Sequence, residues 1–540
     1  MPVTSHEILC YLKAPEGACF EFKEAKGSFH FEKLVEYVVA LANAGGGKIV
    51  LGVTDRRPRQ IVGTQAFTEP GRTEAGLFDR LGHHVSIEEC LHEGHRLLIV
   101  HVPAREPGSV WEDRGVAWSR AGDALVPLTN NQRFLIFLEA APDFSAQLCP
   151  DATLADLDLG AIANFRCRWA VKAKSDRILS LSDERLLVDT ELMADGKLTY
   201  AALILFGTRS ALGKHLARSE VVFEFRSNDL PGPAQDRKEY REGFLLFHDA
   251  IWNQINLRND NQSYQDRFFR IDVPTFDEEV AREAILNAVC HREYRLEGSV
   301  FVRQYSRRIE IISPGGFPNG ITVHNILDEQ RPRNRRLADA FARCGLVERA
   351  GQGMDLIFER TIRHSKPLPE FERSGPNTVF LTLQGTLTDE AFIRFVEKVA
   401  AHKRIKFDAR DLLVLDLVRR RELVPVGLRS RLEFLRGRGV VEAVGRGRGT
   451  VYMLSRAFYA QLNESGSYVH PQLDRDRVKA LLLKHITESG NRGVTIDKLK
   501  QIAPSLSRRH LQRLLAELRA ANQIRMHGSR RGSSWHPPTG

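Results

Sequence analysis

A run of three glycines, Gly45 to Gly47, separates two apolar stretches near the start of the chain. Before it, apolar residues recur every three or four positions, which is the spacing of one buried helix face: Phe31, Leu34, Val35, Val38, Val39 and Ala42. After it, residues 48–54 are largely apolar, as expected of a buried strand. Glycine permits the backbone conformations that end a helix and bring two chain segments close together. The segment therefore predicts a helix and then a strand within an α/β domain.

The chain is too long to fold around one hydrophobic core. Its 540 residues lead us to expect three or four domains. Hydrophobic residues make up 42% and charged residues 27%, which is typical of globular protein. A polar stretch with Pro142 and Pro150 indicates the first boundary. We predict a multidomain α/β and α+β protein with domains at residues 1–140, 155–385, 386–465 and 470–540.

Signals for membranes, secretion and disulfide bonds are missing from the sequence. No stretch of about 18 apolar residues occurs, and the first residues lack the basic and then apolar pattern of a secretory signal. The seven cysteines are scattered and never form a C-x-x-C pair. We therefore expect a cytoplasmic protein with reduced thiols and no membrane partner.

Positive charge is concentrated in the last quarter of the chain. Residues 401–540 hold 28 Lys and Arg against 12 Asp and Glu, a net charge of +16, whereas the remainder has a net charge of −6. Most of this excess is arginine, which binds phosphates through a rigid fork of donors. The distribution predicts a nucleic-acid partner, with a basic surface kept only for solubility as the alternative.

Charged residues surround the first predicted strand. Glu21, Phe22 and Lys23 alternate along it, so Glu21 and Lys23 lie on the same face. Asp55 follows the next predicted strand, and Glu16 precedes Glu21 by five residues. Together Glu16, Glu21 and Asp55 would suit Mg²⁺ or Mn²⁺, which activates water beside a phosphodiester while Lys23 offsets phosphate charge. The alternative is a strand whose carboxylates simply pair with basic side chains.

An ordered series of short motifs covers about residues 10–135. The motifs are Glu21–Lys23, Ala42–Gly47, Ile49–Asp55, Ile61–Gly63 and Arg120–Gly122. The series resembles the AlbA_2 domain of Schlafen proteins. That resemblance implies a ribonuclease with Glu16, Glu21 and Asp55 as its catalytic cluster, or a domain that binds nucleic acid without cutting it. Because Schlafens build a clamp from two such lobes, the single copy here implies at least a homodimer.

The middle region holds short segments with the patterns of regular structure. The predicted strands are Leu203–Phe206, Glu220–Phe225, Ser299–Arg303 and Arg308–Ile312, the last two as a hairpin, and the predicted helix is Glu279–Cys290. On this helix Glu283 and Asn287 are four residues apart and share a face. An acid and an amide so arranged are suited to position a water and a magnesium ion beside a triphosphate.

This helix resembles the N-box of the gyrase and histidine-kinase ATPase superfamily. The continuation at 312–321, 333–334 and 348–354 resembles the RecG-like C-terminal ATPase family more closely. The resemblance implies an ATPase-like α/β sandwich over roughly residues 195–385. It also implies ATP bound by the following residues: Glu283, Asn287, Gly315, Gly351 and Gly353. Ser313 stands where the superfamily has an adenine-reading aspartate, so a retained fold without nucleotide is the alternative.

The basic tail twice shows helices followed by two strands that a basic turn connects. This order is typical of winged helices, whose helices and turns contact grooves and phosphates. We expect nucleic-acid contacts from Arg429, Arg431, Arg436, Arg446, Arg448, Arg508, Arg509, Arg513, Arg530 and Arg531. A winged helix that binds protein is the alternative.

Two functions from different classes are consistent with these patterns. The first is a metal-dependent endoribonuclease acting on tRNA or other RNA, by similarity to Schlafens in stress or anti-phage defence. The second is a DNA-binding transcriptional regulator with a non-cutting AlbA_2 domain and a nucleotide-sensing ATPase-like domain. The three carboxylates favour the first function, and the basic wings and Ser313 favour the second.

Overall fold

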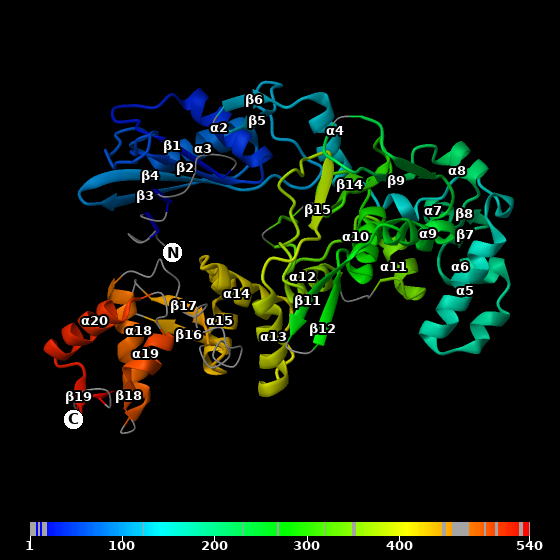
Figure 1. Ribbon diagram of the computed structural model, residues 1–540. Coiled ribbons are helices and arrows are strands. Elements are labelled where there is room, and N and C mark those ends of the chain that lie inside the picture. The colour runs from blue at the N-terminus through cyan, green and yellow to red at the C-terminus, as the bar shows by residue number, and fades with distance from the viewer. Residues whose placement is uncertain are drawn as a thin grey trace. The chain divides into compact units, whose positions relative to one another are not determined.

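The chain folds into two compact units in a computed structural model (Figure 1). One unit is Met1–Phe144 with Phe317–Gly320, and the other is Ser145–Gly316 with Ile321–Gly540. The structure describes residues 7–8, 11–12, 19–122, 124–230, 232–266, 269–318, 320–323, 325–347, 353–444, 450–455, 475–490, 493–502, 506–528 and 533–538. Within these ranges, no helix combines the length and the apolar character needed to cross a membrane.

The first unit is built on a four-stranded sheet. Its elements are β1 (Phe20–Lys23), α2 (Phe31–Asn43), β2 (Gly47–Leu51), α3 (Pro70–Leu81), β3 (Ser86–His92), β4 (His95–Val102), β5 (Trp118–Ala121), β6 (Ala124–Pro127) and α4 (Asn130–Leu138). The strand order is β1-β2-β4-β3, with β1 parallel to β2 and the other pairs antiparallel. The helix and strand predicted on either side of the glycine run are present as α2 and β2.

The glycine run is needed where α2 turns into β2. Gly46 has a φ of +87°, and a Cβ on it would lie 2.7 Å from the backbone nitrogen of Ala104. A Cβ on Gly47 would overlap the carbonyl of Cys19, because β1 runs directly beside β2. Residues with side chains could therefore not bring these three backbone segments so close together.

The second unit begins with a helical region followed by a five-stranded sheet. Its elements up to residue 384 are α5 (Leu159–Ala173), α6 (Asp183–Asp189), β7 (Met193–Ala194), β8 (Lys197–Leu198), α7 (Tyr200–Phe206), α8 (Arg209–His215), β9 (Val221–Phe225), β10 (Asp236–Tyr240), α9 (Phe244–Asn256), β11 (Asn261–Asp266), β12 (Phe269–Pro274), α10 (Glu278–Cys290), β13 (Val300–Gln304), β14 (Arg308–Pro314), α11 (Arg335–Arg343), α12 (Gly353–Arg363) and β15 (Thr378–Gln384). The sheet order is β10-β9-β13-β14-β15. Helix α10 packs against β14 and α12, and β13 with β14 forms the predicted hairpin.

The strand predicted at Leu203–Phe206 is wrong, because these residues belong to helix α7. Thr199 caps the helix, since its side chain accepts a hydrogen bond from the backbone N–H of Ala202. All residues from Ala201 to Phe206 are buried. A helix buried on every side shows no polar face, so its apolar run cannot be distinguished from a buried strand by periodicity.

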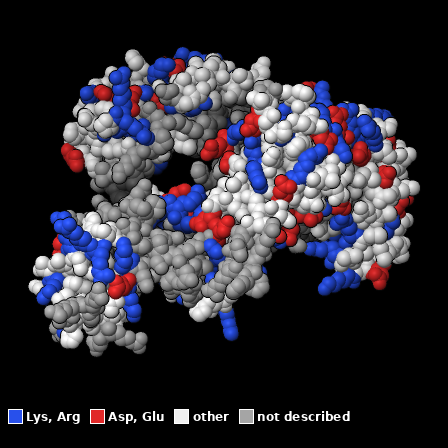
Figure 2. Space-filling view, in the orientation of Figure 1, with Lys and Arg blue, Asp and Glu red and all other residues white. Residues whose placement is uncertain are grey.

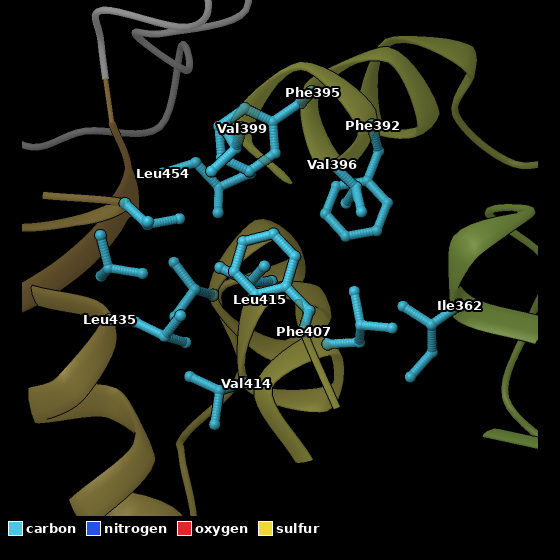
Figure 3. Packing of buried hydrophobic residues seen from close by; sticks show 14 of the residues in the cluster. Ile362, Phe392, Phe395, Val396, Val399, Phe407, Val414, Leu415, Leu435 and Leu454 are labelled. Atoms are coloured by element: carbon cyan, nitrogen blue, oxygen red, sulfur yellow. The ribbon is translucent and has the colours of Figure 1, made fainter. Parts of the chain in front are cut away.

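The next elements share a hydrophobic core with α12. They are α13 (Glu390–Lys403), α14 (Ala409–Arg420), the 3-10 turn η4 (Val426–Leu428), α15 (Arg429–Gly437), β16 (Val441–Val444) and β17 (Val451–Leu454). Figure 3 shows Phe395, Phe407 and Leu415 packed together, with Ile362 of α12 at the edge of the same cluster. The end of the middle region is thus joined to α13 and α14 by buried apolar contacts.

The last elements surround a core to which Met453 of β17 also contributes. They are α18 (Arg475–Glu488), β18 (Val494–Thr495), α19 (Ile496–Ile502), α20 (Arg508–Ala520), β19 (Arg525–His527) and β20 (Ser534–His536). The three strands form a sheet in the order β18-β20-β19. Leucines of α18 and α20, with Trp535 of β20, fill the core. Ser507 caps α20 by accepting a hydrogen bond from the backbone N–H of His510.

Candidate functional site

The residues proposed for the first site gather on one face of β1. Strand alternation places Glu21 and Lys23 on the same side, and Asp55 follows β2, the neighbouring strand. The ammonium nitrogen of Lys23 lies 2.7 Å from Oε1 of Glu21 and 2.9 Å from Oδ2 of Asp55. The structure therefore brings Glu21, Lys23 and Asp55 together. Glu16 lies outside the described residues.

Arg120 completes this cluster from strand β5. Its guanidinium forms an ion pair with Oε2 of Glu21, and both side chains are only 2% exposed. The ring of Tyr37 lies beside both cations, with its centroid 5.4 Å from the Lys23 ammonium and 5.8 Å from the Arg120 guanidinium. The sequence motif Arg120–Gly122 marked this arginine but gave it no role. Two acidic and two basic side chains make the cluster electrically neutral.

The two described carboxylates of this site, Glu21 and Asp55, are both paired with cations. Within the part of the chain that the structure describes, no group of three or more His, Cys, Asp or Glu residues could hold one. Burial lowers the pKa of Lys23, but its bonds to Glu21 and Asp55 raise that pKa by more, so the lysine stays charged. Mg²⁺ or Mn²⁺ would have to displace an ammonium ion that already neutralises both carboxylates. The described residues thus form an ion-pair cluster.

The second candidate site lies between α10 and α12. The side-chain amide of Asn287 donates a 3.1 Å hydrogen bond to Oε1 of Glu283, as their spacing on one helix face predicts. A Cβ on Gly353 would overlap that same Oε1, so a side chain where α12 begins would force Glu283 to move. Burial raises the pKa of Glu283 to about 7, against the opposing effect of the Asn287 hydrogen bond. An acid that titrates near neutral pH is well suited to exchange protons with a water molecule.

Ser313 and Gly315, two further positions of the predicted nucleotide site, contact residues other than Glu283 and Asn287. The hydroxyl of Ser313 donates a 2.8 Å hydrogen bond to the carbonyl of Ala288. Gly315 has a φ of +95°, and a Cβ on it would overlap the guanidinium of Arg333. Arg333 in turn donates to the carbonyl of Gly316. Gly351 lies outside the described residues. Glu283 and Asn287 are therefore joined on one face of α10, whereas the guanidinium of Arg333 lies against Gly315.

The buried carboxyl of Glu283 predicts a pH-dependent stability. Its pKa in the folded protein, about 7, lies above the ordinary value of 4.5. Between these pH values the folded state retains a proton that the unfolded state has lost, so stability falls as the pH rises. Replacing Glu283 by Gln should leave the melting temperature unchanged at acidic pH. At about pH 8 the replacement should raise the free energy of unfolding by on the order of 3 kcal/mol.

Thermal unfolding of parent and variant at about pH 4.5 and about pH 8 checks this expectation. Glu278→Gln is the matched control, because Glu278 is an exposed residue at the start of the same helix. The difference in melting temperature between this control and the parent should be the same at both pH values. An equal shift for Glu283→Gln at both pH values would show that its carboxyl titrates normally.

The arginines predicted to contact nucleic acid differ in their surroundings. On α15, Arg431 lies 2.9 Å from Asp408 and Arg436 lies 2.7 Å from Glu433, while Arg429 is exposed. On α20, Arg508 lies 3.0 Å from Asp497, whereas Arg513 is 3.9 Å from Glu517. Four of the predicted residues lie outside the described part of the chain: Arg446, Arg448, Arg530 and Arg531.

Helix α20 presents one apolar face and one basic face. Leu511, Leu514, Leu515 and Leu518 are buried in the core of the last elements. The opposite face exposes Arg509, Gln512, Arg513, Ala516 and Arg519. Figure 2 shows Lys and Arg side chains gathered over this helix. The exposed face therefore offers guanidinium and amide donors along the length of α20.

Comparison with known proteins identifies three segments of the chain. The family described as "Schlafen, AlbA_2" matches residues 16–129. The family described as "Putative ATP-dependent DNA helicase recG C-terminal" matches residues 297–383, and a domain of unknown function matches residues 136–221. Glu283 and Asn287 lie before residue 297, where the RecG-like match begins. No curated protein matches the chain.

Two solved structures are similar to the chain. The crystal structure of the DIP2311 protein from Corynebacterium diphtheriae is 22% identical, covers 98% of both chains and has a TM-score of 0.50. At this identity the match shows a shared fold. The N-terminal domain of a RecG-related protein from Nitrosomonas europaea is 20% identical over 21% of this chain and 84% of that domain. Its TM-score of 0.17 is too low to bear on the fold.

The matches and the fold define the class of this protein. It is a multidomain mixed α/β protein with an N-terminal AlbA_2 domain of the Schlafen type and a domain like the C-terminal part of RecG. Both domains indicate nucleic acid as the partner.

Proposed function

We propose that this protein binds duplex DNA through its C-terminal elements and acts as a regulator that does not cut nucleic acid. The observation that carries this proposal is the exposed basic face of α20. The order α18, β18, α19, α20, β19 and β20 supports a winged helix, with α20 as the proposed recognition helix. A helix of this kind enters the major groove of DNA.

The side chains on the exposed face of α20 have the chemistry that reads base edges. Arginine donates two hydrogen bonds to guanine, and glutamine pairs with adenine in the same bidentate manner. Arg509, Gln512 and Arg513 lie within about one turn of each other near the start of the helix. Residues near the start of a recognition helix are those that contact bases. Arg519, two turns later, is then available for phosphate.

The ion pairs of the first site argue against cleavage. Glu21 is held by Lys23 and Arg120, and Asp55 by Lys23, so neither described carboxylate is available to a hard cation. The AlbA_2 domain then contributes to binding without cutting. Endoribonuclease activity on RNA, and with it a role in anti-phage defence, is the competing function that the Schlafen likeness supports.

ATP is the proposed ligand of the region around Glu283. The RecG-like match supports it, and Glu283 and Asn287 supply the acid and amide that such a site needs. Ser313 gives weaker recognition of adenine than an aspartate, because its hydroxyl hydrogen is already donated to Ala288. ATP is therefore proposed as a regulatory ligand and not as an energy source. The homodimer remains a prediction.

Titration of the full chain with labelled nucleic acids tests the proposed function. We expect fluorescence anisotropy to show binding to duplex DNA that weakens at least about tenfold between about 50 and 200 mM salt, because released counterions drive phosphate binding. Duplex DNA, single-stranded RNA and tRNA should all stay intact with Mn²⁺ as they do with EDTA. Cleavage that EDTA abolishes would replace this function by that of a nuclease.

A further inference from the structure

We propose that a cavity at one end of the sheet in the first unit binds a nucleotide unit, one base with its phosphate. This site is separate from the basic face of α20 and goes beyond duplex binding. The ligand is either a free mononucleotide or one nucleotide of an exposed single strand, since both present the same chemistry. The experiment below distinguishes these two sources.

The cavity lies where β1, β2 and β3 begin and β4 ends. It measures about 970 Å³, within the range of roughly 300–1,000 Å³ that small-molecule sites occupy. Residues from all four strands line it, and one side is formed by α3. The side chains that carry the argument are Phe20, Lys48, Phe78, His84, Ser86 and His101.

Two glycines keep the cavity open. A Cβ on Gly45 or Gly71 would meet no protein atom within 4 Å, so a side chain there would project into free space. Both glycines line the cavity. Gly45 also has a φ of +105°, a backbone conformation that favours glycine. The absence of side chains at Gly45 and Gly71 leaves this part of the cavity unfilled.

An exposed aromatic pair on one wall suits a base. The rings of Phe78 and His84 stack with their centroids 4.5 Å apart and their planes 29° apart. Phe78 is 42% exposed, which is high for a phenylalanine. Bases stack on such rings whatever their sequence, because every base has a π face. A base that extends this stack would bury the exposed phenylalanine.

Cationic and hydrogen-bonding groups of the strands line the cavity from the face of the sheet opposite α3. Lys48 on β2, His101 on β4 and Ser86 on β3 are direct neighbours across the sheet. The Lys48 ammonium donates a 2.6 Å hydrogen bond to the hydroxyl of Tyr11, which leaves two further N–H donors. Nε2 of His101 lies 3.2 Å from Oε2 of Glu88. Lys48 supplies positive charge for a phosphate, and the Ser86 hydroxyl supplies a further hydrogen-bond donor.

The cavity is independent of the ion-pair cluster around Glu21. Lys23 and Asp55 belong to the opposite ends of β1 and β2, where these parallel strands finish. Phe78 and Lys48 are paired with none of the cluster residues in the contacts described above. Changing Phe78 should therefore leave the cluster intact.

The test uses the full chain with three probes: uridine monophosphate, a short oligouridine strand and inorganic phosphate. Phe78→Ala should weaken oligouridine binding at least about fivefold, because stacking of one base on an aromatic ring is lost. Phe134→Ala is the matched control, since Phe134 is a 46% exposed phenylalanine on α4 of the same unit. The control should bind like the parent. Gly71→Phe, which fills the cavity, should weaken binding as Phe78→Ala does.

The probes separate the two sources of the ligand. Binding of uridine monophosphate that matches the strand identifies a free nucleotide, and binding of the strand alone identifies single-stranded nucleic acid. Parent-like binding by both Phe78→Ala and Gly71→Phe would overturn the proposal, as would binding of phosphate with the affinity of the nucleotide. The titrations are repeated with Arg509→Ala/Arg513→Ala, which removes two arginines from the basic face of α20. Oligouridine binding that is unchanged in this variant belongs to the cavity and does not depend on duplex binding by α20.

Discussion

Replacing Glu21 by Gln is expected to destabilise the first unit by about 3–5 kcal/mol. The reason is that the buried carboxylate neutralises two cations, Lys23 and Arg120, and glutamine neutralises neither. The free-energy cost is largest at Arg120, because its side chain is 2% exposed and its unpaired charge cannot reach solvent. Hydrogen exchange on the full chain measures the effect locally, as faster exchange of β1 and β2 amides in the variant.

Two further substitutions serve as comparisons for Glu21→Gln. Asp55 is 45% exposed, so Asp55→Asn should cost well under 1 kcal/mol. Glu36→Gln makes the same chemical change at a surface ion pair with Lys33 and should also have little effect. A Glu21→Gln protein that exchanges like the parent but loses Mn²⁺-dependent RNA cleavage would identify Glu21 as a metal ligand. The ion-pair assignment would then be wrong.

Replacing Arg509 and Arg513 together by alanine should weaken duplex DNA binding by at least about 30-fold. Each arginine that donates to a base edge contributes about 1–3 kcal/mol, and each that contacts phosphate adds about one to the slope of affinity against salt. Both side chains are exposed on the face of α20 opposite its buried leucines, so the fold should be unaffected. Anisotropy titrations over a range of salt concentrations measure both the affinity and its dependence on salt.

The matched control removes two arginines elsewhere in the same unit. Arg177 and Arg185 are exposed residues of the helical region that begins the second unit. Arg177→Ala/Arg185→Ala carries the same change of net charge, so equal weakening by both double variants would mean that total charge, and not α20, governs binding. Unchanged affinity and slope for Arg509→Ala/Arg513→Ala would exclude α20 as the DNA-reading element.

Local patterns were sufficient to predict many of the elements of this protein. The helix that ends before Gly45, the strand that follows it and the hairpin of β13 and β14 were all predicted from residues close together in the chain. The hydrogen bond from Asn287 to Glu283 likewise follows from a spacing of four on one helix. The apolar run at Leu203–Phe206 was misassigned, because a helix buried on all sides has no periodicity to read.

The partners of the site residues could not be predicted in this way. The sequence determined that Glu21 and Lys23 share a face, but Arg120 reaches Glu21 only because β5 packs against α2 beside the sheet. Gly353 meets Glu283 because α10 packs on α12, and Ile362 joins the core of α13 and α14 by the same kind of packing. Which charges neutralise each other depends on contacts between segments far apart in the chain. Alternation and spacing describe one segment at a time, so only the tertiary structure showed that Arg120 pairs with Glu21.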